Sequence, residues 1–289
     1  MKLLTKKIES NLYYFTYLVK FDKIKSTDGG KNMIIRTFNL TYFLLLFFIL
    51  SACILITCLL RGKSEDIKRK VMYGLCYFNI FLFVIYKVYL KIGNQELLDK
   101  GYRFNIWLEL PIQLCNISLF LVPLGLYKKH DFLYAYGFYI APLGALMALT
   151  FPEPAFTNTN LFYFHNIGFY FTHANIIING VLLVTLGFFK PSFKKVPSLL
   201  VFIIVLTVAS FLVNLSLRAL FHVPANYFFS YEPVGISILE LFWKILPVRC
   251  IYLSFGLIIL IAYVSVITIP FQMCRKKTQE ESEVAEMYE

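Results

Sequence analysis

The strongest constraint on this chain is a series of long apolar stretches separated by short polar connections. A helix needs about 20 predominantly apolar residues to cross the hydrocarbon core of a membrane. About seven stretches reach this length, at residues 39–60, 71–91, 107–127, 132–150, 161–189, 198–217 and 250–269. The sequence therefore predicts an all-α fold, a polytopic transmembrane helical bundle of about seven spans.

The composition supports a membrane protein over a soluble one. Hydrophobic residues make up 58% of the chain and charged residues 16%, against about 45–50% and 25% in soluble domains. The net charge of +11 would suggest nucleic acid in a soluble protein. Here the basic residues lie mostly between apolar stretches, where they would contact lipid headgroups. We expect membrane lipids and no nucleic acid as partners, and the sequence indicates no oligomeric state.

The apolar stretches divide the chain into three parts. Residues 1–38 form a basic N-terminal tail, 39–270 a transmembrane domain and 271–289 a polar C-terminal tail. Within the N-terminal tail, the short aromatic segment 12–21 favours an amphipathic segment at the membrane interface over a secretory signal. Segment 236–248 has the length and mixed polarity of a surface or re-entrant helix.

The distribution of basic residues indicates an orientation. We call the face of the membrane that bears the N-terminus side A and the other side B. Short segments on side B are rich in basic residues, which favours side B and the C-terminus in the cytoplasm, although the lysine-rich N-terminal tail argues the other way. The side B residues are Arg61, Lys63, Lys68, Arg69, Lys70, Lys128, Lys129, Lys190, Lys194, Lys195, Arg275, Lys276 and Lys277.

Polar side chains inside the apolar stretches gather in the half of the membrane next to side A. Such residues are costly in hydrocarbon and usually face other helices or a cavity. Helical spacing places several of them on shared faces. The sequence therefore predicts a polar cavity that opens to side A, lined by the third, fifth and sixth spans. Its expected lining residues are Glu109, Gln113, Cys115, Asn116, His165, Asn166, Thr172, His173, Asn214 and Arg218.

Two of these residues could carry chemistry. Cys115 could be a nucleophile, with His173 or His165 as its base, because a thiol becomes more reactive beside a histidine. Alternatively, Cys115 is a small buried hydrophobe and His173 only joins helices through a hydrogen bond. Glu109 could simply be solvated near the surface, and Arg218 could bind lipid phosphate or extend to the headgroups.

The sequence lacks the motifs that several other chemistries require. The six cysteines include no CxxC pair and no Cys/His run with metal-ligand spacing. No P-loop, GxGxxG, GxSxG or HExxH pattern stands in a convincing context. We therefore predict no metal and no cofactor, and we consider nucleotide-driven transport and serine or zinc hydrolysis unfavoured.

Four segments carry a resemblance to a known family. They are L-P-I-Q-L-C-N-I-S-L-F-L-V-P-L at 110–124, Y-I-A-P-L-G-A-L-M-A-L-T-F-P-E at 139–153, F-Y-F-T-H-A-N at 169–175 and A-N-Y-F-F at 225–229. In order and spacing they resemble the YwaF-type integral membrane proteins over roughly residues 71–270. That family is related to the transmembrane protein 164 group, which is described as acyltransferases acting on ether phospholipids.

The resemblance implies roles for two residues. It makes Cys115 the acyl acceptor and His173 its base. Gln113 stands where the YwaF pattern has His, and Ile112 where the related group has its Cys. Three hypotheses follow: a membrane-embedded lipid acyltransferase, a transporter or small-ligand-binding protein that uses the same cavity, and a structural membrane protein without chemistry. The largely apolar side B half favours a cavity open on one side only.

Overall fold

The computed structural model describes residues 33–93, 95–234 and 236–287. The predicted N-terminal tail therefore lies outside the described residues up to residue 32, and so does the interfacial segment expected at 12–21.

Helices dominate the described residues, and the predicted transmembrane helical bundle is confirmed. Six helices are long and apolar enough to cross a membrane, and α5 (Leu114–Lys128) is a shorter apolar helix. The six are α2 (Leu40–Leu60), α3 (Glu65–Ile92), α6 (Asp131–Thr150), α7 (Phe164–Thr185), α8 (Val196–Phe221) and α10 (Ser254–Met287). Because α10 continues to Met287, it also includes most of the predicted C-terminal tail.

The connections near side A carry the shorter elements. Segment 236–248 contains the short helix α9 (Ser237–Ile245), as its length and polarity indicated. The others are α4 (Gln95–Asp99), the strands β1 (Ile34–Ile35) and β2 (Thr159–Asn160), and the 3₁₀ turns η2 (Pro154–Phe156), η4 (Tyr227–Phe229) and η5 (Ile251–Leu253). A further 3₁₀ turn, η3 (Phe193–Lys195), precedes α8. The two strands pair antiparallel, with Ile34 opposite Asn160.

The third span is shorter than the sequence predicts. Residues 107–113 are irregular, and α5 begins only at Leu114, with Gln113 as its N-cap. Pro111 contributes to this, because a proline disfavours helical backbone at the residue before it. Glu109 therefore lies in a loop and not on the third span as predicted.

Helix α7 lies at the centre of the bundle and packs against α6, α3 and α2. Close helix contact depends on small residues there. A Cβ built on Gly180 of α7 would lie 2.4 Å from Pro142 Cγ and 2.5 Å from the Gly137 carbonyl oxygen of α6. One on Gly168 would lie 2.5 Å from the Tyr86 side chain of α3. These glycines let the backbones of α6 and α3 approach α7.

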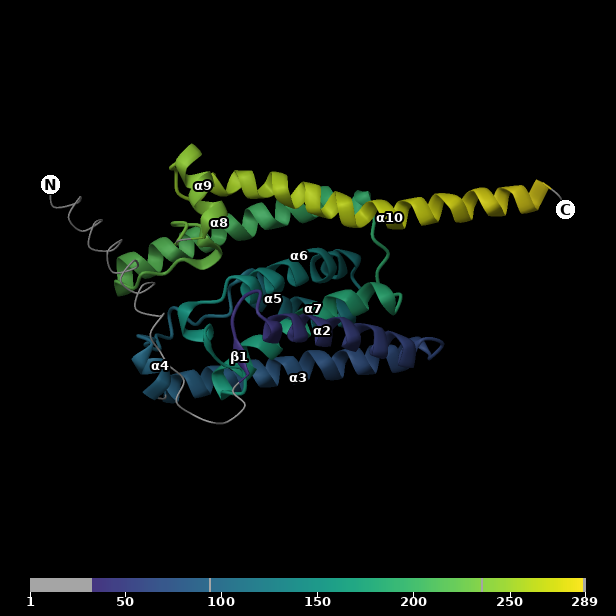
Figure 1. Ribbon diagram of the computed structural model, residues 1–289. Helices are drawn as coiled ribbons and strands as arrows, with labels where there is room; N and C mark the ends of the chain where they lie inside the picture. The colour runs from purple at the N-terminus through teal and green to yellow at the C-terminus, as the bar shows by residue number, and fades with distance from the viewer. Residues whose placement is uncertain (1–32, 94, 235, 288–289) are drawn as a thin grey trace. The chain divides into compact units, whose positions relative to one another are not determined.

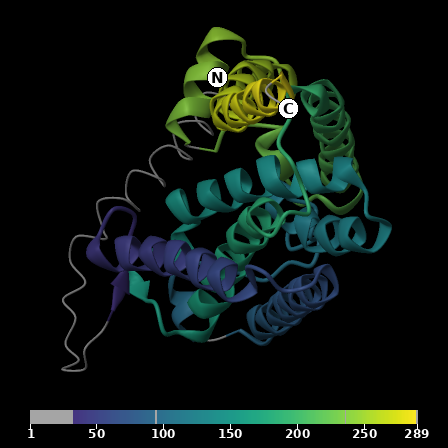
Figure 2. The same cartoon turned by 90° about the vertical axis from the view of Figure 1, so that its right-hand side faces the viewer.

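Helices α8, α9 and α10 form a second group. Figures 1 and 2 show this group on one side of α5, α6 and α7, with α2 and α3 on the other. Contacts between α8 and α6 are far fewer than those between α6 and α7. The space between the two groups of helices holds the cavity described next.

Candidate functional site

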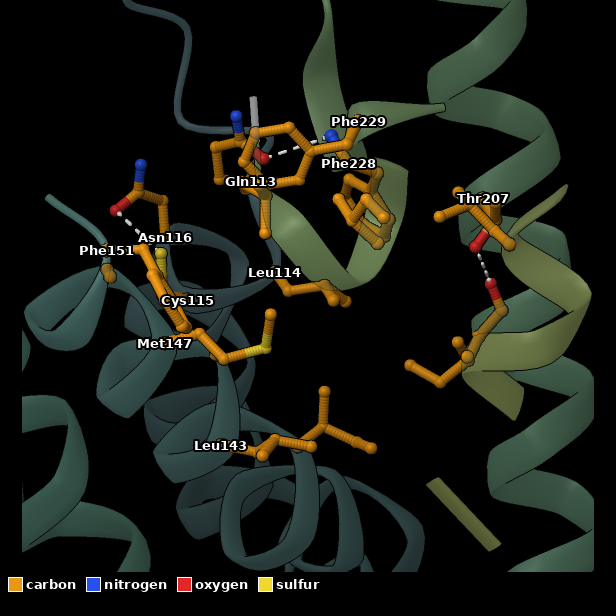
Figure 3. Close-up of a pocket in the computed structure, with 18 of the residues that line it drawn as sticks. Gln113, Leu114, Cys115, Asn116, Leu143, Met147, Phe151, Thr207, Phe228 and Phe229 are labelled. Atoms are coloured by element: carbon orange, nitrogen blue, oxygen red, sulfur yellow. Dashed lines mark hydrogen bonds between the residues drawn. The ribbon is translucent and has the colours of Figure 1, made fainter. Parts of the chain in front are cut away.

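A cavity of about 590 Å³ lies between the two groups of helices. One wall comes from α3, α5, α6 and α7, and the opposite wall comes from α8, α10 and the turns near side A. Figure 3 shows Cys115, Leu143 and Met147 on one wall, Thr207 of α8 on the other, and Phe228 and Phe229 between them. Its volume falls within the roughly 300–1,000 Å³ typical of small-molecule sites.

Cys115 lies in the first turn of α5, not in the middle of a helix as the predicted span implied. Its side chain lines the cavity, and its thiol contacts the Asn116 side-chain oxygen at 3.8 Å. The α6 backbone comes close here, because a Cβ built on Gly144 would lie 3.4 Å from the Cys115 backbone nitrogen. The cysteine is therefore held between the start of α5 and the middle of α6.

The start of α5 also provides hydrogen-bond donors. The first backbone N–H groups of a helix have no partner within the helix. The backbone N–H groups of Cys115 and Asn116 lie within hydrogen-bond reach of the Cys115 sulfur. The Gln113 side chain does not cap them, since its Oε1 accepts from the Phe228 N–H at 3.0 Å. Two backbone donors at the start of α5 thus point toward the thiol sulfur.

His173 faces the same cavity from α7. Its Nδ1 lies 2.7 Å from the Phe169 carbonyl oxygen, one helical turn earlier. A carbonyl oxygen only accepts, so Nδ1 carries the hydrogen and donates it, and Nε2 keeps its lone pair. In the part of the chain that the structure describes, Nε2 has no hydrogen bond, and none joins the ring to the Cys115 thiol. The ring is thus oriented with its basic nitrogen unpaired.

Thr172 lines the cavity next to His173. Its backbone carbonyl accepts a hydrogen bond from the Asn79 side-chain nitrogen of α3 at 3.2 Å. This bond links the middle of α7 to α3, and it fixes the position of His173 along the bundle axis.

Charged side chains gather at the side A end of the cavity. The Lys87 ammonium of α3 forms an ion pair with the Glu109 carboxylate, and the Tyr102 hydroxyl donates to Glu109 Oε1 at 2.5 Å. The Lys87 and Glu109 side chains are only 21% and 14% exposed. Glu109 is therefore paired and largely buried, and the alternative that it is simply solvated is wrong.

Glu153 adds a second carboxyl group to this end of the cavity. The Glu153 residue is exposed in part, but many protein atoms lie around its carboxyl group. Desolvation and the negative charge of Glu109 raise the pKa of the Glu153 carboxyl, while Lys87 opposes the shift. Two acids and one lysine thus share the polar end of the cavity.

The cavity includes six of the predicted residues and excludes four. Glu109, Gln113, Cys115, Asn116, Thr172 and His173 line it. His165 is fully buried beside the rings of Phe156 and Tyr163 and does not line the cavity. Asn166 donates to the Asn160 carbonyl at 2.6 Å, which fastens the loop before α7.

Asn214 and Arg218 were predicted to line the cavity, and the structure corrects this. The Asn214 side chain is fully buried and bonds the Tyr227 backbone on both sides, donating to its carbonyl at 3.0 Å and accepting from its N–H at 2.8 Å. Arg218 donates to the Ala225 carbonyl at 2.8 Å and pairs with Glu232 at 3.0 Å. Both residues hold the loop after α8, because their faces of α8 turn toward that loop.

The sequence did not indicate that α6 and α10 line the cavity. It did predict the sixth span, α8, as part of the wall, and α8 lies there, but through Ile203, Ile204, Thr207 and Val208 and not through Asn214 and Arg218. The lining side chains of these three helices are almost all apolar, so they carry no polar signal. Lys87 did carry one, as one of two lysines, with Lys91, near the side A end of the second span, but nothing in the sequence paired it with Glu109. Among the described residues, no group of three His, Cys, Asp or Glu side chains is arranged to hold a metal ion.

Comparison with known proteins gives one match. The family described as the TMEM164 family matches residues 34–268, which include every lining residue of the cavity. No curated protein and no solved structure was found to match the chain. The match agrees with the predicted relation to the transmembrane protein 164 group and does not confirm the YwaF-type assignment.

Proposed function

The chain belongs to the TMEM164 family, and from this premise we propose that it is a membrane-embedded lipid acyltransferase with Cys115 as acyl acceptor and His173 as general base. The observation that carries the proposal is the shared cavity. A thiol at a helix start, the backbone N–H donors beside it and a histidine with its Nε2 unpaired all border one space between membrane-spanning helices.

The first half of the reaction forms a thioester. His173 Nε2 takes the thiol proton as the Cys115 sulfur bonds to the carbonyl carbon of a phospholipid ester. The N–H groups at the start of α5 are suitable donors for the oxyanion that develops on the carbonyl oxygen. The ester C–O bond then breaks, and the leaving alkoxide takes the proton from His173. The products are a lysophospholipid and acyl-Cys115.

The second half transfers the acyl group. The hydroxyl of an acceptor lysophospholipid gives its proton to His173 Nε2 as its oxygen bonds to the thioester carbonyl carbon. The C–S bond breaks, and the Cys115 thiolate recovers the proton from His173. Burial makes this base necessary, because a charged sulfur is costly in apolar surroundings.

The test uses purified protein in liposomes. A phospholipid with an isotope-labelled acyl chain is supplied with an unlabelled lysophospholipid, and mass spectrometry measures labelled product. We expect Cys115→Ala to abolish transfer and His173→Gln to lower it by about 100-fold or more, as loss of a general base does. Cys76→Ala is the matched control, because Cys76 is a buried free cysteine of α3 outside this cavity.

Two outcomes of this test would contradict the proposed acyltransferase. Transfer that persists in Cys115→Ala would refute the thioester route. Wild-type protein that transfers nothing, but binds lipid, would favour the alternative of a ligand-binding or transport protein without catalysis.

We also propose that side B and the C-terminus face the cytoplasm, because the basic residues of the short connections lie there. In inside-out vesicles of the expressing cell's membrane, an epitope tag after residue 289 should be cleaved by added protease. Protection of the tag in those vesicles, with cleavage in intact cells, would reverse the orientation.

A further inference from the structure

The cavity has two chemically different parts. Its polar part holds Lys87, Glu109, Glu153, Cys115 and His173. Its other part is lined by apolar stripes of three helices, each with helical spacing. The stripes comprise Ile140, Leu143 and Met147 of α6, Ile203, Ile204, Thr207 and Val208 of α8, and Gly256, Leu257 and Leu260 of α10.

The single hydroxyl in these stripes is already satisfied. Thr207 Oγ1 donates to the Ile203 carbonyl of its own helix at 2.8 Å, as the dashed line in Figure 3 marks. Ser254, in the first turn of α10, is the second hydroxyl residue that these helices give to the cavity wall, and the other residues of the stripes are apolar. The chemistry of the apolar part suits hydrocarbon.

The wall of the apolar part is incompletely packed. Ile204 and Val208 of α8 keep 44% and 46% of their surface exposed, and Met147 of α6 keeps 38%. These helices are long and apolar enough to span the membrane, so the surroundings of this wall are lipid chains and not water. Ile203 of α8 and Leu260 of α10 also line the cavity, and both are buried.

Gly256 keeps space open in this wall. A Cβ built on it would have no atom within 4 Å, although the residue lines the cavity. Its φ is not positive, so the backbone accepts any L-residue. A Cβ at this position therefore displaces no neighbouring atom, and a larger side chain would extend from a residue that lines the cavity.

We propose that the apolar part binds the fatty acyl chain that is transferred, with the carbonyl carbon at Cys115 and the methyl end toward Ile203 and Leu260. Gly256 admits the chain, and the two buried residues limit its length. This inference rests on the proposed function, because it extends the same site.

The experiment compares Gly256→Phe with Gly74→Phe. Gly74 is the matched control, because it also lies in a membrane-spanning helix with no atom within 4 Å of a built Cβ, but it does not line the cavity. Transfer is measured in the liposome assay with a long-chain and a short-chain donor phospholipid. We expect Gly256→Phe to lower long-chain transfer by about tenfold or more and to spare short-chain transfer. Gly74→Phe should match the wild type with both donors.

A second readout does not depend on catalysis. A phospholipid with a photoreactive group near the end of its acyl chain is crosslinked to the purified protein, and the labelled peptides are identified. Labels on the α6, α8 and α10 stripes that disappear in Gly256→Phe support the inference. If these stripes are unlabelled, or if Gly256→Phe transfers long chains as the wild type does, the inference is wrong while acyl transfer by Cys115 stands. A wild type that transfers nothing but labels these stripes would refute the proposed function alone.

Discussion

The ion pair between Lys87 and Glu109 offers a quantitative test of the cavity. Replacing Lys87 by methionine keeps the length of the side chain and removes its charge. Glu109 then remains a mostly buried carboxylate whose described hydrogen bond comes from Tyr102. Removing one partner of a fully buried pair costs about 3–5 kcal/mol, chiefly because the other charge stays unpaired. The partial exposure of both side chains lowers our expectation to roughly 2–4 kcal/mol.

The assay is thermal unfolding of the detergent-purified protein in a double-mutant cycle. A loss of this size should lower Tm by on the order of 10 °C in Lys87→Met. The double variant Lys87→Met with Glu109→Gln should recover part of the loss, with a coupling energy of about 1–3 kcal/mol. The physical reason is that the second change removes the unpaired charge that the first creates.

An exposed ion pair on side B provides the control. Lys195 and Asp131 lie 3.2 Å apart with side chains 37% and 64% exposed. Such pairs contribute about 0–1 kcal/mol, so Lys195→Met should shift Tm little. Additive effects of the Lys87 and Glu109 substitutions, or equal losses from the two pairs, would refute the reasoning.

Three further outcomes can be checked by the same thermal unfolding assay. Asn214→Leu should cost about 2–4 kcal/mol, because it removes buried hydrogen bonds and leaves the Tyr227 N–H without its acceptor; an unchanged Tm would contradict this. Gly180→Val should destabilise by about 3 kcal/mol or more, since its Cβ would overlap Pro142, and normal folding would show that α6 and α7 can separate. Glu153 binds its proton more tightly when folded, so its contribution to stability is greatest below its ordinary pKa of 4.5 and falls as pH rises through the folded value. Glu153→Gln should therefore raise Tm at neutral pH and lose that advantage in acid, and a gain that persists in acid would contradict the assignment.

Several features followed from the sequence alone. The helical bundle was predictable because crossing a membrane requires a length of apolar residues, and length is a local property of the chain. Cys115, His173 and Asn116 were found because polar groups in apolar stretches are costly and therefore informative. Their gathering near side A followed from counting the spans.

Tertiary structure decided the rest. Helices α8 and α10 are apolar on nearly every face, so their sequences carry no period that separates a lipid-facing side from a cavity-facing one. For the same reason, nothing in the sequence showed that Asn214 turns toward the loop after α8. The start of α5 at Leu114 depends on how the chain turns at Pro111 and on the Gln113 side chain bonding Phe228, far away in sequence. The sequence determines the position of a residue along a helix, but the direction that its side chain faces depends on which neighbours pack around that helix.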